Sequence, residues 1–335
     1  MSEDSHAPRI VPVLVPTPAE RPYSYSVPAG MAVRPGAIVR VPLGPREVAG
    51  IVWDGPTDAV DERKLRPVSE VFDCPPLGPD ALRFIEWVAG WTLSAPGMVA
   101  RMFLRAPAAF DPEPMLEGLR FCGGAPDRVT DARKRVLELA RDGMAWTRSG
   151  LAHAAGVSST VVDGLVAQGL FEKVAIPPRP VAAAPDPGYA RPSLSRDQEA
   201  AARTLREKVG AGFSVTLLDG VTGSGKTEVY LEAVAAALEA GRQVLVLVPE
   251  IALTAAFLER FQDRFGAKPA EWHSDLSPRM RERVWRQVAE GRVRVVAGAR
   301  SALFLPFREL GLIAVDEEHD PAYKQEDRVF YNARD

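Results

Sequence analysis

The chain has 335 residues and a formal net charge of −3, and 46% of its residues are hydrophobic and 25% charged. These values are those of a soluble globular protein with room for two or three domains. No apolar run approaches the length of a membrane span, and residues 1–9 are acidic and polar, unlike a secretory signal. Cys74 and Cys122 are the two cysteines, too few for a four-cysteine zinc site. We therefore expect a cytoplasmic protein with reduced thiols, no zinc and no membrane contact.

Residues 1–107 are expected to form a small β-rich domain. Short strands are predicted at Ile10–Val15, Ile38–Val41 and Val48–Trp53. The last two are expected to form a hairpin. Tyr23 and Tyr25 alternate, so both point to one face, where they either stack on a base or fill the core. Core packing is the favoured interpretation. From Pro79 to Ala106 the apolar pattern becomes helical.

A proline-rich connector is expected at residues 108–127, followed by a three-helix domain at 128–176. Its helix-turn-helix pattern with a short β wing predicts a winged-helix domain. The second helix of the pair, Ser158–Gln168, contains Asp163 and no Lys or Arg. It therefore has no positive side chain with which to bind DNA phosphates. We therefore expect this helix to dock on DNA by its shape, or to act as a spacer, rather than to read bases. Prolines crowd residues 177–193 and predict an extended linker.

Residues 194–335 alternate strands with helices, which predicts a RecA-like α/β lobe whose parallel sheet is covered on both faces. The predicted elements are strand 215–218, helix 226–240, strand 244–248, helices 254–265 and 278–290, and strands 293–297 and 312–315. Ligands of such sheets gather at the carboxyl ends of the strands.

A complete G-x-x-x-x-G-K-[ST] loop follows the first of these strands, as Gly220-Val221-Thr222-Gly223-Ser224-Gly225-Lys226-Thr227. Its glycines let backbone N–H groups curl around phosphate oxygens. Lys226 can reach the β and γ phosphates, and the Thr227 hydroxyl can ligate Mg²⁺. The strand before the loop and the helix after it provide the context that this motif requires. A nucleoside triphosphate is the implied ligand.

Asp316-Glu317-Glu318-His319 follows the last predicted strand. As an isolated tetrapeptide it would be a solvated charge run. With a phosphate loop upstream, Asp316 is expected to hold Mg²⁺ and Glu317 to orient or deprotonate the attacking water. Gln198, just before the first helix of the lobe, either binds an adenine or completes a capping box with Ser195. The residues alone leave both interpretations open.

Seven arginines crowd residues 279–300, which contain only two glutamates. They form either a solvated helix face or a groove that tracks the backbone of single-stranded nucleic acid. Residues 323–331 mix aromatic and basic side chains in one loop, among them Tyr323, Lys324 and Phe330. These side chains either stack on bases or pack locally.

Six segments resemble the first helicase lobe of the primosomal protein N′ (PriA) family of bacterial replication restart helicases. They are Gly220–Tyr230, Val248–Thr254, His273–Ser277, Gly298–Phe304, Asp316–Asp320 and Tyr323–Asp327. The resemblance continues weakly through the winged helix to the N-terminus. It implies an ATP-dependent helicase that unwinds DNA 3′ to 5′ at stalled or abandoned forks and initiates restart. The implied partners are forked and single-stranded DNA, other primosome proteins and single-stranded DNA-binding protein.

The resemblance also assigns roles by position. It implies that Lys226 and Thr227 bind the nucleotide. It implies that Asp316 and Glu317 serve Mg²⁺ and the attacking water, and that His319 couples the two lobes. The implied DNA contacts are a backbone site at Arg300 and Ser301, a coupling loop with Tyr323 and Lys324, and an N-terminal unit, containing Tyr23, that binds a 3′ end.

The chain departs from the family pattern in two places. Ser24 stands where the family usually has an acidic residue after the first aromatic of its N-terminal signature. The chain also stops at Asp335, before the family's second motor lobe, arginine finger and zinc-binding cysteines. The expectation is therefore the N-terminal domains and first lobe of such a helicase. The alternative is a catalytically incomplete scaffold that binds fork DNA and nucleotide.

Overall fold

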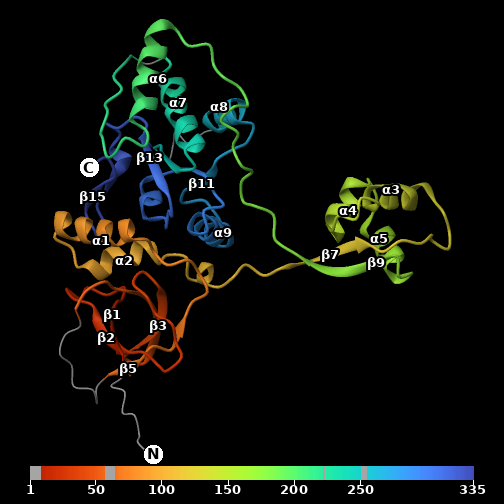
Figure 1. The fold of residues 1–335 in the computed structure, drawn as a ribbon, viewed down its shortest axis with the longest axis horizontal. Coiled ribbons are helices and arrows are strands. Elements are labelled where there is room, and N and C mark those ends of the chain that lie inside the picture. The colour runs from red at the N-terminus through yellow and green to blue at the C-terminus, as the bar shows by residue number, and fades with distance from the viewer. Residues whose placement is uncertain (1–8, 57–64, 222, 250–254) are drawn as a thin grey trace, which may run out of the picture. The chain divides into compact units, whose positions relative to one another are not determined.

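The structure is a computed structural model that describes residues 9–56, 65–221, 223–249 and 255–335. The chain divides into two compact units, one of Met1–Pro112 with Pro180–Asp335 and one of Glu113–Arg179. Figure 1 shows the elements of each unit.

The first unit opens with a six-stranded sheet whose order is β5-β2-β1-β4-β3-β6. The strands are β1 (Ile10–Leu14), β2 (Tyr23–Ser26), β3 (Ile38–Leu43), β4 (Arg46–Val52), β5 (Arg66–Pro67) and β6 (Glu70–Val71). The predicted hairpin is confirmed, because Leu43 pairs with Arg46 across a two-residue turn. Valines alternate into one core cluster along β1 and β3, and Leu14 and Ile38 on the opposite face pack into another.

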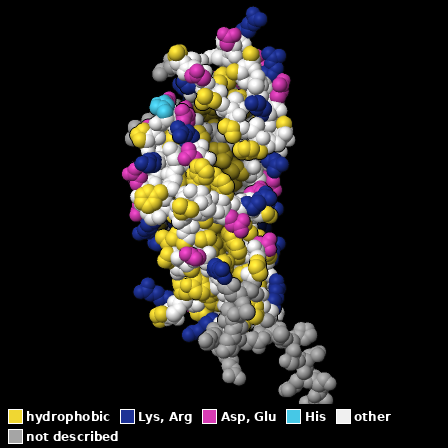
Figure 2. Space-filling model, turned by 90° about the vertical axis from the view of Figure 1, so that its left-hand side faces the viewer, with side chains coloured by type: hydrophobic (Ala, Val, Ile, Leu, Met, Phe, Trp, Pro, Cys, Tyr) yellow, Lys and Arg dark blue, Asp and Glu magenta, His cyan; other side chains and the backbone are white. Residues whose placement is uncertain are grey.

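Two helices follow the sheet, α1 (Pro79–Thr92) and α2 (Pro96–Phe103), with a 3₁₀ turn at Pro107–Phe110. The predicted helical stretch is interrupted because Leu93 adopts a left-handed φ of 53° and Pro96 begins a new helix. Trp87 and Trp91 are 48% and 64% exposed, and their rings stack with centroids 5.6 Å apart. Hydrophobic side chains are visible at the surface on the face drawn in Figure 2.

A parallel sheet of order β11-β12-β10-β13 forms the other half of this unit. Its strands are β10 (Gln243–Leu247), β11 (Ala270–Trp272), β12 (Val295–Gly298) and β13 (Leu310–Val315), and its helices are α6 (Arg196–Lys208), α7 (Lys226–Glu239), α8 (Ala255–Phe265) and α9 (Pro278–Ala289). Val244 and Val246 pack with α7 and α8, whereas Leu245 and Leu247 pack with α9. The prediction of a parallel sheet covered on both faces is confirmed.

The predicted strand at residues 215–218 is wrong. Residues 213–221 form no regular element, and Phe213, Val215 and Leu217 are 97%, 82% and 77% exposed. Within the described residues, β13 pairs with β10 alone and is an edge strand. The β-branched and aliphatic residues indicated strand propensity, but a strand also needs a partner that satisfies its backbone groups.

The β-rich part and the parallel-sheet part of this unit share one hydrophobic core. The Trp285 Nε1–H of α9 donates to the Phe103 carbonyl at 2.8 Å. Arg286 donates to the carbonyls of Ala109 and Phe110 at 3.3 and 3.2 Å. Trp285 is 1% exposed, so this junction is a packed interface with its polar groups satisfied.

The second unit combines three helices with a three-stranded antiparallel sheet of order β8-β7-β9. Its elements are β7 (Leu116–Phe121), α3 (Asp131–Ala140), β8 (Trp146–Thr147), α4 (Arg148–Ala154), α5 (Ser159–Ala167) and β9 (Phe171–Ile176). The three-helix pattern is confirmed, and the predicted helix Ser158–Gln168 agrees with α5 to within a residue at each end. Residues 116–121, expected as part of the connector, instead form the strand that pairs with the predicted wing. Among the described helices of the chain, none is long and apolar enough to cross a membrane.

Candidate nucleotide-binding and DNA-binding site

The phosphate-binding loop lies directly before α7, which begins at Lys226. Gly223 and Gly225 have left-handed φ values of 81° and 80°, a conformation that strains other residues. A Cβ at Gly225 would lie 2.4 Å from the amide nitrogen of Gln198. The loop therefore needs glycine there both for its backbone and for its neighbour. Thr222 lies outside the described residues.

The Lys226 ammonium lies against its own loop. Its Nζ donates to the carbonyls of Gly220 and Val221 at 2.6 and 3.3 Å. Gly220, Gly223 and Ser224, the predicted phosphate cradle, are exposed. A phosphate group can reach this loop from solvent when Lys226 exchanges its carbonyl partners for phosphate oxygens.

The fold brings the predicted metal ligand Asp316 to the helix that carries the other one, Thr227. Tyr230, on α7, donates its hydroxyl hydrogen to Asp316 Oδ2 at 3.0 Å, and Thr227 lies three residues earlier on the same helix. Burial, followed by the charge of Asp316, raises the pKa of Tyr230 above its ordinary value. The phenol therefore stays protonated at neutral pH. The first carboxylate after β13 is thus bonded to a residue that lies one helical turn from Thr227 on the same face of α7.

The acidic segment turns sharply after Asp316. Glu317 has a left-handed φ of 48°, which is uncommon for a residue other than glycine. Its backbone N–H donates to Asp316 Oδ1 at 3.0 Å, and its carboxylate lies 3.6 Å from His319 Nε2. The side chains of Glu317 and His319 are 51% and 75% exposed. Both lie beside Asp316, where water has access.

The donor set near the loop fits Mg²⁺ bound together with a nucleotide. Mg²⁺ usually takes one or two protein oxygens and completes its shell with water and phosphate oxygens. Thr227 and Asp316 supply such oxygens. The described residues hold no cluster of three His, Cys, Asp or Glu side chains suited to a metal ion, so a metal site built from protein ligands alone finds no support in them.

Gln198 forms the capping box at the start of α6. Its Oε1 accepts from the Ser195 N–H at 2.8 Å, and its own N–H donates to Ser195 Oγ at 3.3 Å. Its amide nitrogen donates to the Ser224 carbonyl at 2.8 Å. The capping interpretation is therefore confirmed, and the same side chain also contacts the phosphate loop.

Two family models match this chain. The 3′ DNA-binding domain (3′BD) of PriA matches residues 12–105, and DEAD/DEAH box helicase matches residues 195–333. Replication restart protein PriA of Rickettsia felis is 31% identical over 328 residues and that of Haemophilus influenzae 35% over 344 residues, each alignment covering 98% of this chain. The chain belongs to the PriA family. It spans 40% and 46% of the length of these two relatives.

Arg300 and Ser301, the predicted backbone contacts of this PriA-family chain, are used within the fold. Arg300 donates through Nε to Gln325 Oε1 at 3.1 Å and through Nη1 to the carbonyls of Ala322 and Lys324, both at 2.7 Å. Ser301 Oγ accepts from the Trp272 indole at 3.1 Å. The Arg300 contacts join the 3₁₀ helix Arg300–Phe304 to the segment that follows the acidic residues, and the Ser301 contact joins it to β11.

Tyr323 packs inside the protein and is 1% exposed. Its hydroxyl oxygen lies 3.0 and 2.5 Å from the carbonyl oxygens of Leu247 and Asp316, which share its single hydrogen. The structure thus supports local packing of this ring rather than stacking on a base. Lys324 is exposed and pairs with Glu326 at 2.6 Å. Phe330, which is 63% exposed, is an aromatic ring of this segment that solvent reaches.

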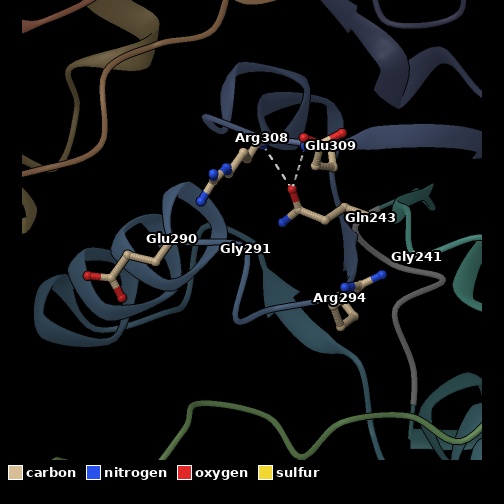
Figure 3. Close-up of a pocket in the computed structure, with 7 residues that line it drawn as sticks. All are labelled: Gly241, Gln243, Glu290, Gly291, Arg294, Arg308 and Glu309. Carbon is tan, nitrogen blue, oxygen red and sulfur yellow. Dashed lines mark hydrogen bonds between the residues drawn. The ribbon is translucent and has the colours of Figure 1, made fainter.

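The arginines of residues 279–300 do not share one role. Arg286 is 8% exposed and bonds Glu290 and interior carbonyls. Arg294 lines a pocket of about 310 Å³ (Figure 3), together with Gly241, Gln243, Glu290, Gly291, Arg308 and Glu309. Because Gln243 begins β10, this pocket lies at the amino end of the sheet, opposite the phosphate loop. It is therefore distinct from the candidate nucleotide site.

The two N-terminal tyrosines have different environments. Tyr25 is 4% exposed and donates its hydroxyl hydrogen to the Pro42 carbonyl at 3.0 Å, so core packing is confirmed for it. Tyr23, the predicted 3′-end contact, is 43% exposed at the start of β2. Its ring is available to a ligand.

The sequence analysis overlooked Tyr230 as a site residue, although it ends one of the segments that resemble the PriA family. The available signal was its spacing. Tyr230 follows Thr227 by three residues on one helix, and residues three apart lie on the same face.

Proposed function

We propose that the chain forms the DNA-recognising and nucleotide-binding part of an ATP-dependent 3′ to 5′ helicase that restarts replication at stalled or abandoned forks. The observation that carries this proposal is the hydrogen bond of Tyr230 to Asp316, three residues along α7 from Thr227 of the exposed phosphate loop. Membership of the PriA family supports the restart role.

In this proposal the parallel-sheet part is a RecA-like lobe. Lys226 and the loop amides of Gly220, Gly223, Ser224 and Gly225 bind the ATP phosphates. Mg²⁺, when bound, neutralises phosphate charge, and Thr227 and Asp316 hold it. The oxygens of Glu317 accept hydrogen from the attacking water, His319 beside it couples the lobes, and Gln198 supports the nucleotide site through its bond to the Ser224 carbonyl of the phosphate loop.

DNA binding is assigned to three regions. The domain at residues 1–107 takes a 3′ end near Tyr23. The Glu113–Arg179 unit acts as a winged helix, and this is supported by its three helices, its antiparallel sheet and the pairing of Asp163 with Arg148 at 3.0 Å, which neutralises the acid on α5. Lys324 and the segment held by Arg300, Ser301 and Tyr323 contact single-stranded DNA. The partners are forked DNA, other primosome proteins and single-stranded DNA-binding protein, in the cytoplasm.

Lys226→Ala tests the nucleotide half of the proposal. The change removes the ammonium that attracts phosphate, so the affinity for fluorescent ATP should fall at least tenfold, measured by titration. Affinity for a labelled fork, measured by anisotropy, should stay within twofold because other regions supply it. Lys268→Ala, an exposed lysine outside the loop, is the control and should change neither affinity. A parallel loss of both affinities in Lys226→Ala contradicts the assignment.

The scaffold alternative has one observation in its favour. Residues 213–217 lie exposed outside the sheet, and Lys226 is bonded to carbonyls of its own loop. Such a loop suits nucleotide binding without efficient turnover. ATP hydrolysis measured with and without forked DNA separates the two functions. Stimulation by the fork supports the motor, and binding without stimulated hydrolysis supports the scaffold.

A further inference from the structure

The Tyr230 hydroxyl is bonded to one of the groups proposed to bind Mg²⁺, and the direction of this hydrogen bond can be determined. A phenol has a single hydrogen. Tyr230 donates that hydrogen to Asp316 Oδ2 at 3.0 Å. The Asp316 carboxylate is therefore the acceptor, and Thr227 lies three residues before Tyr230 on α7.

This bond holds the Asp316 carboxylate in one orientation and leaves it able to bind a cation. Asp316 is restrained at both oxygens, because Oδ2 accepts from Tyr230 and Oδ1 accepts from the Glu317 N–H at 3.0 Å. Each carboxylate oxygen retains a further lone pair.

We propose that Tyr230 is a positioning residue for the divalent cation: its hydroxyl orients the Asp316 carboxylate before the metal arrives. The inference rests on the proposed nucleotide site and adds a residue that does not touch the metal. Groups that orient metal ligands through hydrogen bonds commonly change metal affinity 10- to 100-fold when they are removed.

Tyr230→Phe removes the hydroxyl and keeps the ring. The full chain is titrated with Mn²⁺ in the presence of ADP, and free Mn²⁺ is followed by electron paramagnetic resonance. We expect the variant to bind Mn²⁺ roughly 10- to 100-fold more weakly than the unchanged chain. In EDTA its affinity for ADP should stay within twofold, because the loop and Lys226 are untouched.

Tyr25→Phe is the matched control, because it also deletes one phenol hydroxyl bonded inside the protein, here to the Pro42 carbonyl, in the six-stranded sheet. It should leave both affinities unchanged. The inference is overturned if Tyr230→Phe binds Mn²⁺ as well as the control does, or more tightly. It is also overturned if ADP affinity in EDTA falls in parallel, since the ring then serves only the shape of the loop. An unchanged chain that binds no ADP at all is a separate result that overturns the proposed function itself.

Discussion

Glu232→Gln should destabilise the chain because it breaks a buried ion pair on α7. Glu232 and Arg264 are 8% and 5% exposed. Oε1 of Glu232 accepts from Arg264 Nε and Nη2 at 3.0 and 2.8 Å, and Oε2 accepts from Arg206 at 3.1 Å. Removing one partner of such a pair costs about 3–5 kcal/mol, since the other charge stays buried without its counter-ion.

The lower end of that range applies to Glu232→Gln. A glutamine oxygen still accepts a hydrogen bond, and Arg264 keeps its bond to the Pro187 carbonyl at 2.8 Å. We therefore expect a loss of about 3 kcal/mol in the free energy of unfolding. Urea denaturation followed by circular dichroism measures this loss. In a thermal scan it corresponds to a melting temperature lower by roughly 6–12 °C.

Glu228→Gln is the matched control, four residues earlier on the same helix. Glu228 pairs with Arg260 of α8 at 3.6 Å, and the two side chains are 31% and 55% exposed. An exposed pair contributes less than about 1 kcal/mol. Equal losses in the two variants, or no loss in Glu232→Gln, would refute the reasoning. Replacing Glu232 and Arg264 together by Leu and Met should recover most of the stability.

Three further predictions concern other parts of the fold. Gln243→Leu removes four hydrogen bonds to the backbone, two donated to Val288 and Val293 and two accepted from residues 308 and 309, so urea denaturation should show a loss of about 2–4 kcal/mol. Val215→Asp should change stability by less than about 0.5 kcal/mol, and a loss above roughly 2 kcal/mol would indicate that residue 215 is buried in solution. Burial raises the pKa of the Cys74 thiol to about 12, so at pH 8 it stays protonated and unreactive. A thiol reagent should label the exposed Cys122 alone, and Cys122→Ser should abolish labelling.

The sequence predicted the parallel-sheet part well where the hydrophobic pattern of a segment and its place in the order of elements indicated the same structure. The unbroken apolar run of β10 identified a strand buried on both faces, and the structure buries Val244–Leu247 completely. The phosphate-loop motif located the start of α7 at Lys226 because the motif requires a helix there. The register also placed Asp316 at the carboxyl end of β13, where its N–H donates to the Leu247 carbonyl at 2.9 Å.

The sequence failed where pairing depends on a distant partner. The β-strand propensity of Val215, Thr216 and Leu217 describes how well their side chains fit a pleated sheet. It does not specify a neighbouring strand with which they could pair. In the structure Lys208 Nζ instead donates to Thr216 Oγ1 at 2.8 Å. Strand β7 was missed for a related reason, since Gly118 interrupts its apolar residues and its partner β9 begins fifty residues later. Tyr323 was ambiguous because aromatic residues serve cores and DNA surfaces equally well.

The two halves of the candidate nucleotide site differ in how firmly the fold holds them. The α7 half is fixed by the Glu232–Arg264 pair and by Tyr230 on Asp316. The loop half is exposed, and Lys226 must give up its bonds to Gly220 and Val221 before it reaches a phosphate. Hydrogen bonds to a charged group are worth about 1.5–3 kcal/mol each, and charge-assisted bonds to phosphate replace them.

Nucleotide binding should therefore order the loop and leave α7 as it is. We expect hydrogen exchange at the amides of residues 223–227 to slow when ATP and Mg²⁺ are added, because those N–H groups then donate to phosphate oxygens. Exchange in the interior of α7, residues 231–238, should not change, since its hydrogen bonds already exist without ligand. Slowing across α7 with none in the loop would place the nucleotide elsewhere. Unchanged exchange in both segments at saturating nucleotide would show that the loop does not close on phosphate.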